Sequence, residues 1–173
     1  MNASISVSED SFRLKKPFTI SRGTRVAATV VTATEERDGV VGRGECVPYA
    51  RYGESVESVR AEIEGLDPGI DRRELQSALP PGAARNAVDC ALWDLEAKAS
   101  GTSAWALAGL PAPDPVLSAF TLSLDTPEAM EHEARSEAAR PLLKVKLGGE
   151  GDLTRIEAVR RGSPDARIIV DAN

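Results

Sequence analysis

The feature that most constrains the fold is a regular alternation of short apolar runs and helical segments in the last third of the chain. The apolar runs predict strands over residues 116–124, 142–147 and 167–171. The segments between them predict helices over residues 126–139 and 151–161. A β-α-β-α-β order is typical of a parallel sheet, because a crossover helix returns the chain to the same edge. Three strands neither close a barrel nor complete such a sheet, so we expect the beginning of a larger β/α structure.

The first part of the chain has a different pattern. Residues 5–13 and 26–35 are strand-like, and glycines punctuate a hairpin over residues 37–46. Together these segments predict a three-stranded antiparallel meander. Residues 16–25 are too polar and too rich in chain-breaking residues to be a strand throughout, so we expect a loop there. A second loop is expected over residues 47–53.

Two helices and a boundary follow the meander. Residues 55–65 carry apolar side chains at helical spacing, and residues 83–100 are rich in alanine and leucine, which favour helix. The proline-rich stretch 110–115 then separates this pattern from the β/α alternation. We therefore expect an α+β domain over residues 1–114 and the first units of a parallel β/α domain over residues 115–173.

Composition excludes several classes of partner. Of the 173 residues 42% are apolar, enough to bury a core, and the formal net charge is −6. An acidic chain with no Lys/Arg block longer than two argues against nucleic acid or an anionic membrane as the main partner. No apolar run approaches the roughly 20 residues that span a bilayer. The two cysteines, Cys46 and Cys90, have no metal-binding spacing, so we expect reduced, buried thiols in a cytoplasmic protein.

A pair of lysines ends the second predicted parallel strand. Lys144 and Lys146 are two residues apart, so their side chains point to the same face of that strand. Two ammonium groups so close together repel, which favours the neutral form of one lysine and makes it a usable base near neutral pH. The alternative interpretation of the same residues is a strand end with two solvated lysines.

An acidic residue ends the next predicted strand. The apolar run before Asp171 puts its carboxylate at the top of a buried strand, where barrel enzymes have their active sites. A hard cation such as Mg²⁺ binds carboxylate oxygens well. The alternative is an aspartate that caps a helix or organises a loop. The lysine pair and Asp171 end successive strands. A functional role for both is therefore better supported than it would be for either motif alone.

These motifs carry a resemblance to a known family. Lys144-Val-Lys146 followed by Val170-Asp-Ala-Asn173 resembles the enolase superfamily, in its muconate-lactonizing branch. Residues 17–23, 42–55 and 82–95 look like the capping domain of the dipeptide epimerases of that branch, and the segment Tyr49-Ala-Arg-Tyr-Gly-Glu-Ser55 is the most specific pointer. The resemblance covers nearly the whole chain.

The resemblance implies a fold and a reaction. The fold would be an α+β capping domain followed by the first β/α units of a (β/α)7β TIM-type barrel, with the barrel incomplete in this chain. The reaction would be Mg²⁺-dependent epimerisation of a dipeptide of the L-Ala-D/L-Glu type, by 1,1-proton transfer through an enediolate. Lys146 would be the acid/base on one face of the substrate, and Lys144 would ease its deprotonation and help to hold the substrate carboxylate. Asp171 would be the first of three Mg²⁺ ligands, and Asn173 would orient Lys146 or a metal-bound water.

Four further residues are candidates for substrate binding. Arg22 lies in the first predicted loop and Arg51 and Tyr52 in the second, and in the family these loops cover the barrel mouth and select the substrate. An arginine fork suits a glutamyl side-chain carboxylate, although solvated loop arginines are the alternative. Thr121, near the end of the first parallel strand, would line the site or simply pack within its strand.

The family pattern also implies an opposing lysine and two more acidic ligands beyond Asn173, so we expect a complete site only in a longer protein. Related reactions of the same branch remain alternatives: cycloisomerase, o-succinylbenzoate synthase or N-acylamino acid racemase. A non-catalytic truncated interaction module is the alternative of another class. For the enzyme we expect a small-molecule dipeptide as partner, no nucleic acid, no membrane, a homo-oligomer and a cytoplasmic location.

Overall fold

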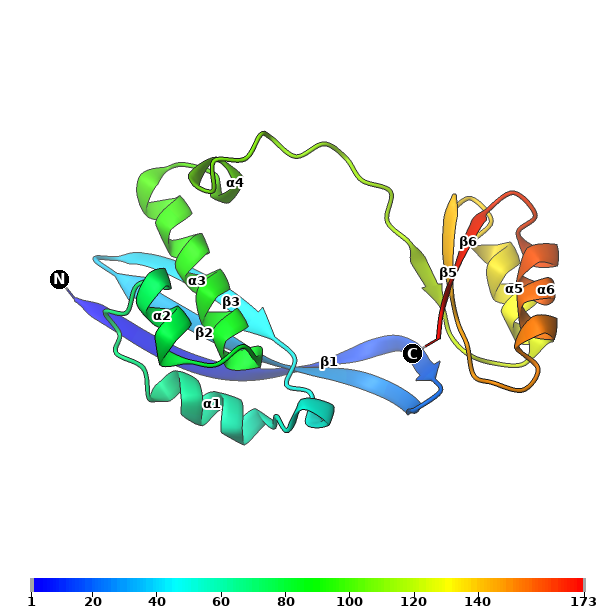
Figure 1. The fold of residues 1–173 in the computed structure, drawn as a ribbon, viewed down its shortest axis with the longest axis horizontal. Helices are drawn as coiled ribbons and strands as arrows, with labels where there is room; N and C mark the ends of the chain where they lie inside the picture. The colour runs from blue at the N-terminus through cyan, green and yellow to red at the C-terminus, as the bar shows by residue number, and fades with distance from the viewer. Residues whose placement is uncertain (1, 173) are drawn as a thin grey trace. The chain divides into compact units, whose positions relative to one another are not determined.

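The chain forms two compact units in a computed structural model that describes residues 2–172 (Figure 1). The first unit comprises the residues up to Phe12 together with Ala28–Pro113. The second unit comprises Arg13–Ala27 together with the residues from Asp114 onward. The tip of the first hairpin therefore groups with the C-terminal segment rather than with the rest of the hairpin.

The first unit is built on a three-stranded sheet of order β1-β2-β3, as the meander prediction requires. Its strands are β1 (Ala3–Ile20), β2 (Gly23–Arg37) and β3 (Val40–Cys46). Strands β2 and β3 pair antiparallel around a tight turn in which Asp38 and Gly39 both have positive φ, 49° and 83°. Such a two-residue turn matches the twist of the flanking strands.

The loop expected over residues 16–25 is much shorter than predicted. Strand β1 continues to Ile20 and β2 begins at Gly23, which leaves only Ser21 and Arg22 in the turn. The polar composition misleads here because most side chains of the hairpin end are exposed and need no apolar core. Its strand conformation is maintained by backbone pairing and by hydrogen bonds to a segment about 100 residues later, described below.

The first unit also contains helices, of which α3 (Ala83–Ser100) packs directly on the sheet. The others are α1 (Val56–Glu64), α2 (Arg72–Ala78) and α4 (Ala104–Leu107), with a 3₁₀ turn, η1, at Ala50–Tyr52. The two helices expected over 55–65 and 83–100 are confirmed by α1 and α3. Helix α2 was not predicted, because Leu75 is its only buried residue and gives no periodic apolar signal.

Helix α3 lies unusually close to strand β3. A Cβ atom on Gly42 would come within 2.2 Å of the Ala91 carbonyl oxygen, and one on Gly44 within 2.0 Å of the Ala87 carbonyl oxygen. Any side chain at these two glycines would therefore push the helix away from the sheet. The close approach lets the alanine-rich face of α3 pack directly on the strands, in a core that includes Val31, Ala33, Val88, Leu92 and Leu95.

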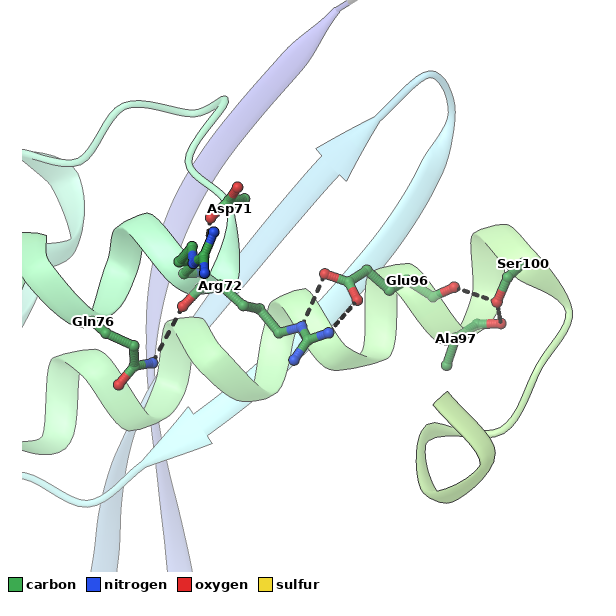
Figure 2. A network of polar contacts seen from close by, with 7 residues as sticks. Asp71, Arg72, Gln76, Glu96, Ala97 and Ser100 are labelled. Carbon is green, nitrogen blue, oxygen red and sulfur yellow. Dashed lines mark hydrogen bonds and ion pairs between the residues drawn. The ribbon is translucent and has the colours of Figure 1, made fainter. Parts of the chain in front are cut away.

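A polar contact fastens α2 to α3 on the outside of that core (Figure 2). The guanidinium of Arg72 donates two hydrogen bonds to the Glu96 carboxylate, at 2.9 and 2.8 Å, and lies 3.5 Å from the ring centre of Trp93. A forked arginine–carboxylate pair combined with stacking on an aromatic face favours one fixed geometry. The contact therefore sets the position of the short helix α2, which has little buried surface of its own.

The second unit contains a three-stranded parallel sheet of order β4-β5-β6, as predicted for the β/α segment. Its strands are β4 (Phe120–Leu122), β5 (Leu142–Lys146) and β6 (Arg167–Asp171), connected by α5 (Pro127–Ser136) and α6 (Asp152–Gly162). Strand β4 is shorter than the predicted 116–124, because it has a partner only along three residues of β5. The core between helices and sheet includes Leu122, Met130, Leu143, Val145 and Val159.

Two further expectations from the sequence concern the cysteines and membrane-spanning helices. Both cysteines are free thiols, but only Cys46 is buried; Cys90 is exposed, contrary to the prediction. Within residues 2–172 no helix is long and apolar enough to cross a membrane.

Candidate active site

The two faces of the parallel sheet in the second unit carry different side chains. Leu143 and Val145 of β5 are fully buried on the face that α5 and α6 cover. Lys144 and Lys146 alternate with them and therefore point from the opposite face. In the register of the sheet Lys146 stands opposite Asp171. The uncovered face thus collects polar groups at the carboxyl ends of its strands.

The carboxylate of Asp171 joins the two lysines. Oδ2 of Asp171 lies 2.7 Å from Nζ of Lys144 and 2.7 Å from Nζ of Lys146. The exposed fractions of the three side chains are 33% for Lys144, 15% for Lys146 and 27% for Asp171. Two cations and one anion leave an excess positive charge in a partly desolvated site, where electrostatic interactions are stronger than in water. The site can therefore attract an anionic group such as a substrate carboxylate.

Thr121 lies on the same face as the lysines. It pairs in register with Lys144 on the neighbouring strand, and it is half-buried. Registered residues of a parallel pair point to the same side of the sheet. The structure therefore places the Thr121 side chain beside the lysine pair.

Ser123, two residues further along the chain, was not singled out from the sequence. It is only 9% exposed, and its Oγ accepts a hydrogen bond of 2.9 Å from the backbone N–H of Thr19. The signal that could have identified it is the period of two in this strand, which puts Ser123 on the same face as Thr121.

The loop residues expected to bind substrate lie in different units. Arg22 occupies the exposed turn between β1 and β2 and belongs to the second unit, like the lysine pair. Arg51 and Tyr52 are exposed in η1 of the first unit, where the ring of Tyr52 lies 5.5 Å from that of Tyr49. Asn173 lies outside the described residues.

The loop that carries Arg51 and Tyr52 is held by Glu54. One carboxylate oxygen of Glu54 accepts from the N–H of Tyr49 at 2.9 Å, and the other from the N–H of Ala83 at 2.7 Å. Ala83 is the first residue of α3, and its cap, Gly82, has no side chain to satisfy that N–H. Glu54 therefore connects the loop to the start of the longest helix in the chain.

Asp171 has the chemistry of a ligand for a hard divalent cation. Its carboxylate is partly exposed at a strand end, and hard cations such as Mg²⁺ prefer oxygen ligands. Among residues 2–172 no three or more His, Cys, Asp or Glu side chains gather as a metal-binding group. The described residues can therefore supply one carboxylate ligand to the metal, but not a complete set of ligands.

Comparison with known proteins identifies the family. Residues 2–109 match the family described as mandelate racemase / muconate lactonizing enzyme, N-terminal domain. The chain belongs to this family. Its antiparallel first sheet and parallel second sheet have the architecture of a capping domain followed by part of a barrel.

Several of the relatives that the chain resembles are epimerases. It is 46% identical to the L-Ala-D/L-Glu epimerase of Escherichia coli K12, over 98% of this chain and 54% of that protein. A solved enolase family member from Agrobacterium tumefaciens, described as having homology to dipeptide epimerases and containing sodium and L-Ala-L-Glu, superimposes with a TM-score of 0.94. It is 50% identical and is matched over 99% of this chain and 54% of its own.

A third comparison includes magnesium. The dipeptide epimerase of Methylococcus capsulatus, solved with Mg and L-Arg-D-Lys, superimposes with a TM-score of 0.87 at 29% identity, over 98% of this chain and 53% of its own. This chain therefore spans about half the length of the family members that it matches.

Proposed function

We propose that the protein is an isomerase that epimerises a dipeptide of the L-Ala-D/L-Glu type with the help of Mg²⁺. The observation that carries this proposal is the convergence of Lys144, Lys146 and Asp171 at the carboxyl ends of adjacent parallel strands. The similarity to the Escherichia coli epimerase supports the choice of reaction, and the Mg-containing relative supports the choice of metal.

The described residues suit the first half of such a reaction. Lys146, the less exposed of the two lysines, would take the α-proton from one face of the substrate with its neutral amine, and Asp171 positions its Nζ atom through the 2.7 Å contact. Lys144 would bind the substrate carboxylate and bring the α-carbon to Lys146. Asp171 would also be one ligand of Mg²⁺, which when bound supplies positive charge to stabilise the anion formed at the carboxylate.

Inversion needs a second base on the opposite face of the α-carbon. We place that base, and the other metal ligands, outside residues 2–172. This assignment agrees with the finding that the chain spans only about half of its relatives.

We further propose that residues 1–114 are a capping domain that selects the substrate, and that residues 115–173 begin the barrel. Arg22, Arg51 and Tyr52 would recognise the second residue of the dipeptide, with an arginine fork bound to the glutamyl side-chain carboxylate. Thr121 would line the site beside Lys144, because the two are paired in register.

The test is direct. The full-length protein is incubated with Mg²⁺ and either L-Ala-L-Glu or L-Ala-D-Glu, and the diastereomers are separated by chromatography. We expect both reactions to reach the same mixture, and EDTA to stop both. If neither dipeptide is converted while an N-acylated amino acid is racemised, the dipeptide assignment is wrong.

A further inference from the structure

We propose that Ser123 is a positioning residue that fastens the tip of the β1–β2 hairpin to the lysine-bearing face of the parallel sheet. Its consequence for substrate binding rests on the proposed function. The contact itself is a feature of the second unit and can be tested independently.

Two hydrogen bonds join the hairpin to the end of β4. The N–H of Thr19 donates to Oγ of Ser123 at 2.9 Å, and the N–H of Leu124 donates to the carbonyl oxygen of Thr19 at 3.0 Å. Both polar groups of the Thr19 backbone are thus satisfied by two consecutive residues of another segment. A reciprocal pair of this kind fixes both the distance and the direction of approach.

The contact lies at the level of the lysine pair. Leu122, the last residue of β4, pairs with Val145, so Ser123 lies one residue beyond β4, near the level of Lys146 on β5. Ser123 also shares the face of Thr121, which is the face that carries the lysines. The hairpin tip is therefore docked at the edge of the proposed active site.

Arg22 is close in the sequence to Thr19, which makes the contact with Ser123. Thr19 and Thr24 face each other across the hairpin with their hydroxyl oxygens 2.9 Å apart, and Arg22 lies in the turn between them. Gly23 has a φ of 136°, a conformation that side chains other than glycine rarely adopt. Lys16 forms an ion pair with Glu133 of α5 and provides a second attachment. Fixing Thr19 therefore restricts where the Arg22 side chain can reach.

This makes Ser123 a determinant of substrate affinity that does not itself contact the reacting atoms. Its hydroxyl is nearly buried, so removing it would leave the Thr19 N–H without its acceptor. The hairpin tip would then open more often, and a dipeptide that depends on Arg22 would bind less tightly. The lysine pair would retain its geometry, because the contacts of its Nζ atoms with Asp171 do not involve Ser123.

The test uses a matched pair, Ser123→Thr and Ser123→Val, in the full-length protein. The two side chains have nearly the same size and differ in whether they carry the hydroxyl, so any effect of bulk on folding is shared. Ser118→Ala, at an exposed position between α4 and β4, is the control for loss of a serine hydroxyl. The first measurement is hydrogen–deuterium exchange of the peptide covering residues 17–25, and the second is the steady-state kinetics of L-Ala-L-Glu epimerisation.

We expect Ser123→Val to raise the exchange rate of residues 17–25 about tenfold over Ser123→Thr. KM should rise by a similar factor, with kcat changed less than about twofold. Equal exchange in the two variants would show that the Ser123 hydroxyl does not hold the hairpin tip, whether or not the protein is an epimerase. Faster exchange with an unchanged KM would overturn the positioning role. If no dipeptide is converted by the unaltered protein, the proposed function fails, but the exchange measurement still tests whether Ser123 holds the hairpin tip.

Discussion

Nζ of Lys146 lies 2.7 Å from Oδ2 of Asp171, directly opposite it on the neighbouring parallel strand. The contact orients the ammonium group at the carboxyl end of the sheet, where the substrate would lie. It also connects the proposed base to the proposed metal ligand. Substitutions at the two positions should nevertheless affect proton exchange differently, because one removes a base and the other weakens a metal ligand.

Lys146→Ala should strongly slow α-proton exchange from one epimer of the dipeptide only. Each base of a two-base epimerase contacts the hydrogen on its own face of the carbon, so the opposing base would still exchange the other epimer. We expect a loss of roughly 10²–10⁴-fold for the affected epimer. The measurement is the disappearance of the α-proton NMR signal in D₂O with Mg²⁺, for each epimer separately, with the exposed Lys15→Ala as control. Wild-type exchange of both epimers would show that Lys146 is not a base.

Asp171→Asn should instead slow exchange from both epimers. The neutral amide is a weaker ligand for a hard cation, and both directions of the reaction depend on the same stabilised anion. We expect a loss of roughly hundredfold or more for each epimer, partly restored by raising the Mg²⁺ concentration. Asp165→Asn, at an exposed loop position, makes the same chemical change away from the site. An epimer that kept its full exchange rate would contradict the assignment of Asp171.

Gly44→Ala should destabilise the first unit. The added Cβ would lie 2.0 Å from the Ala87 carbonyl oxygen and 2.5 Å from the Ala91 nitrogen, both backbone atoms of α3 that cannot move independently. We expect a loss of about 3 kcal/mol in the free energy of unfolding in urea, at the upper end of overpacking costs. Gly69→Ala is the control, because its nearest neighbour is a carboxylate oxygen of the exposed Asp67 side chain at 3.2 Å. Its effect should stay within about 0.5 kcal/mol. Equal stability of the two variants would mean that α3 can shift on the sheet without cost.

The sequence was informative where a signal is local. The period of the β/α segment predicted the parallel sheet, the composition of residues 83–100 predicted α3, and the strand ends drew attention to Lys144, Lys146 and Asp171. These features depend on residues a few positions apart, and their chemistry is visible in the residue types. The roles assigned to the three site residues stay predictions, although the structure brings their side chains together.

Features that depend on distant partners were not predictable in this way. The hairpin end around Thr19 remains a strand because Ser123 satisfies its backbone, and nothing near Thr19 in the sequence indicates this contact. The glycines of residues 37–46 predict only a hairpin, whereas the structure shows that Gly42 and Gly44 also make room for α3. Helix α2 is positioned by the pair of Arg72 with Glu96, 24 residues later. In each case the deciding interaction is tertiary, and it overrides the local propensity.

The buried carboxyl of Glu35 should make the stability of the protein depend on pH. The Glu35 side chain is fully buried in the first unit, and neither carboxylate oxygen has a hydrogen-bond partner among the described residues. The closest cation is Arg37, whose guanidinium nitrogen lies 3.8 Å from Oε2. Burial raises the pKa of Glu35 from 4.5 to about 7, and Arg37 opposes the shift only in part.

Because the folded pKa is the higher one, the folded state holds this proton over a range of pH in which the unfolded chain has already lost it. The contribution of Glu35 to the free energy of unfolding should therefore be highest below about pH 4.5. It should fall by about 3 kcal/mol in total as pH rises toward 7, and level off above that. Glu35→Gln removes the titration, so its free energy of unfolding should change less between pH 5 and pH 8 than that of the unaltered protein. The exposed neighbour Glu36→Gln makes the same change in charge and should retain the full dependence. Parallel stability–pH curves for the unaltered protein and Glu35→Gln, measured by urea unfolding, would show that the buried carboxyl keeps its ordinary pKa.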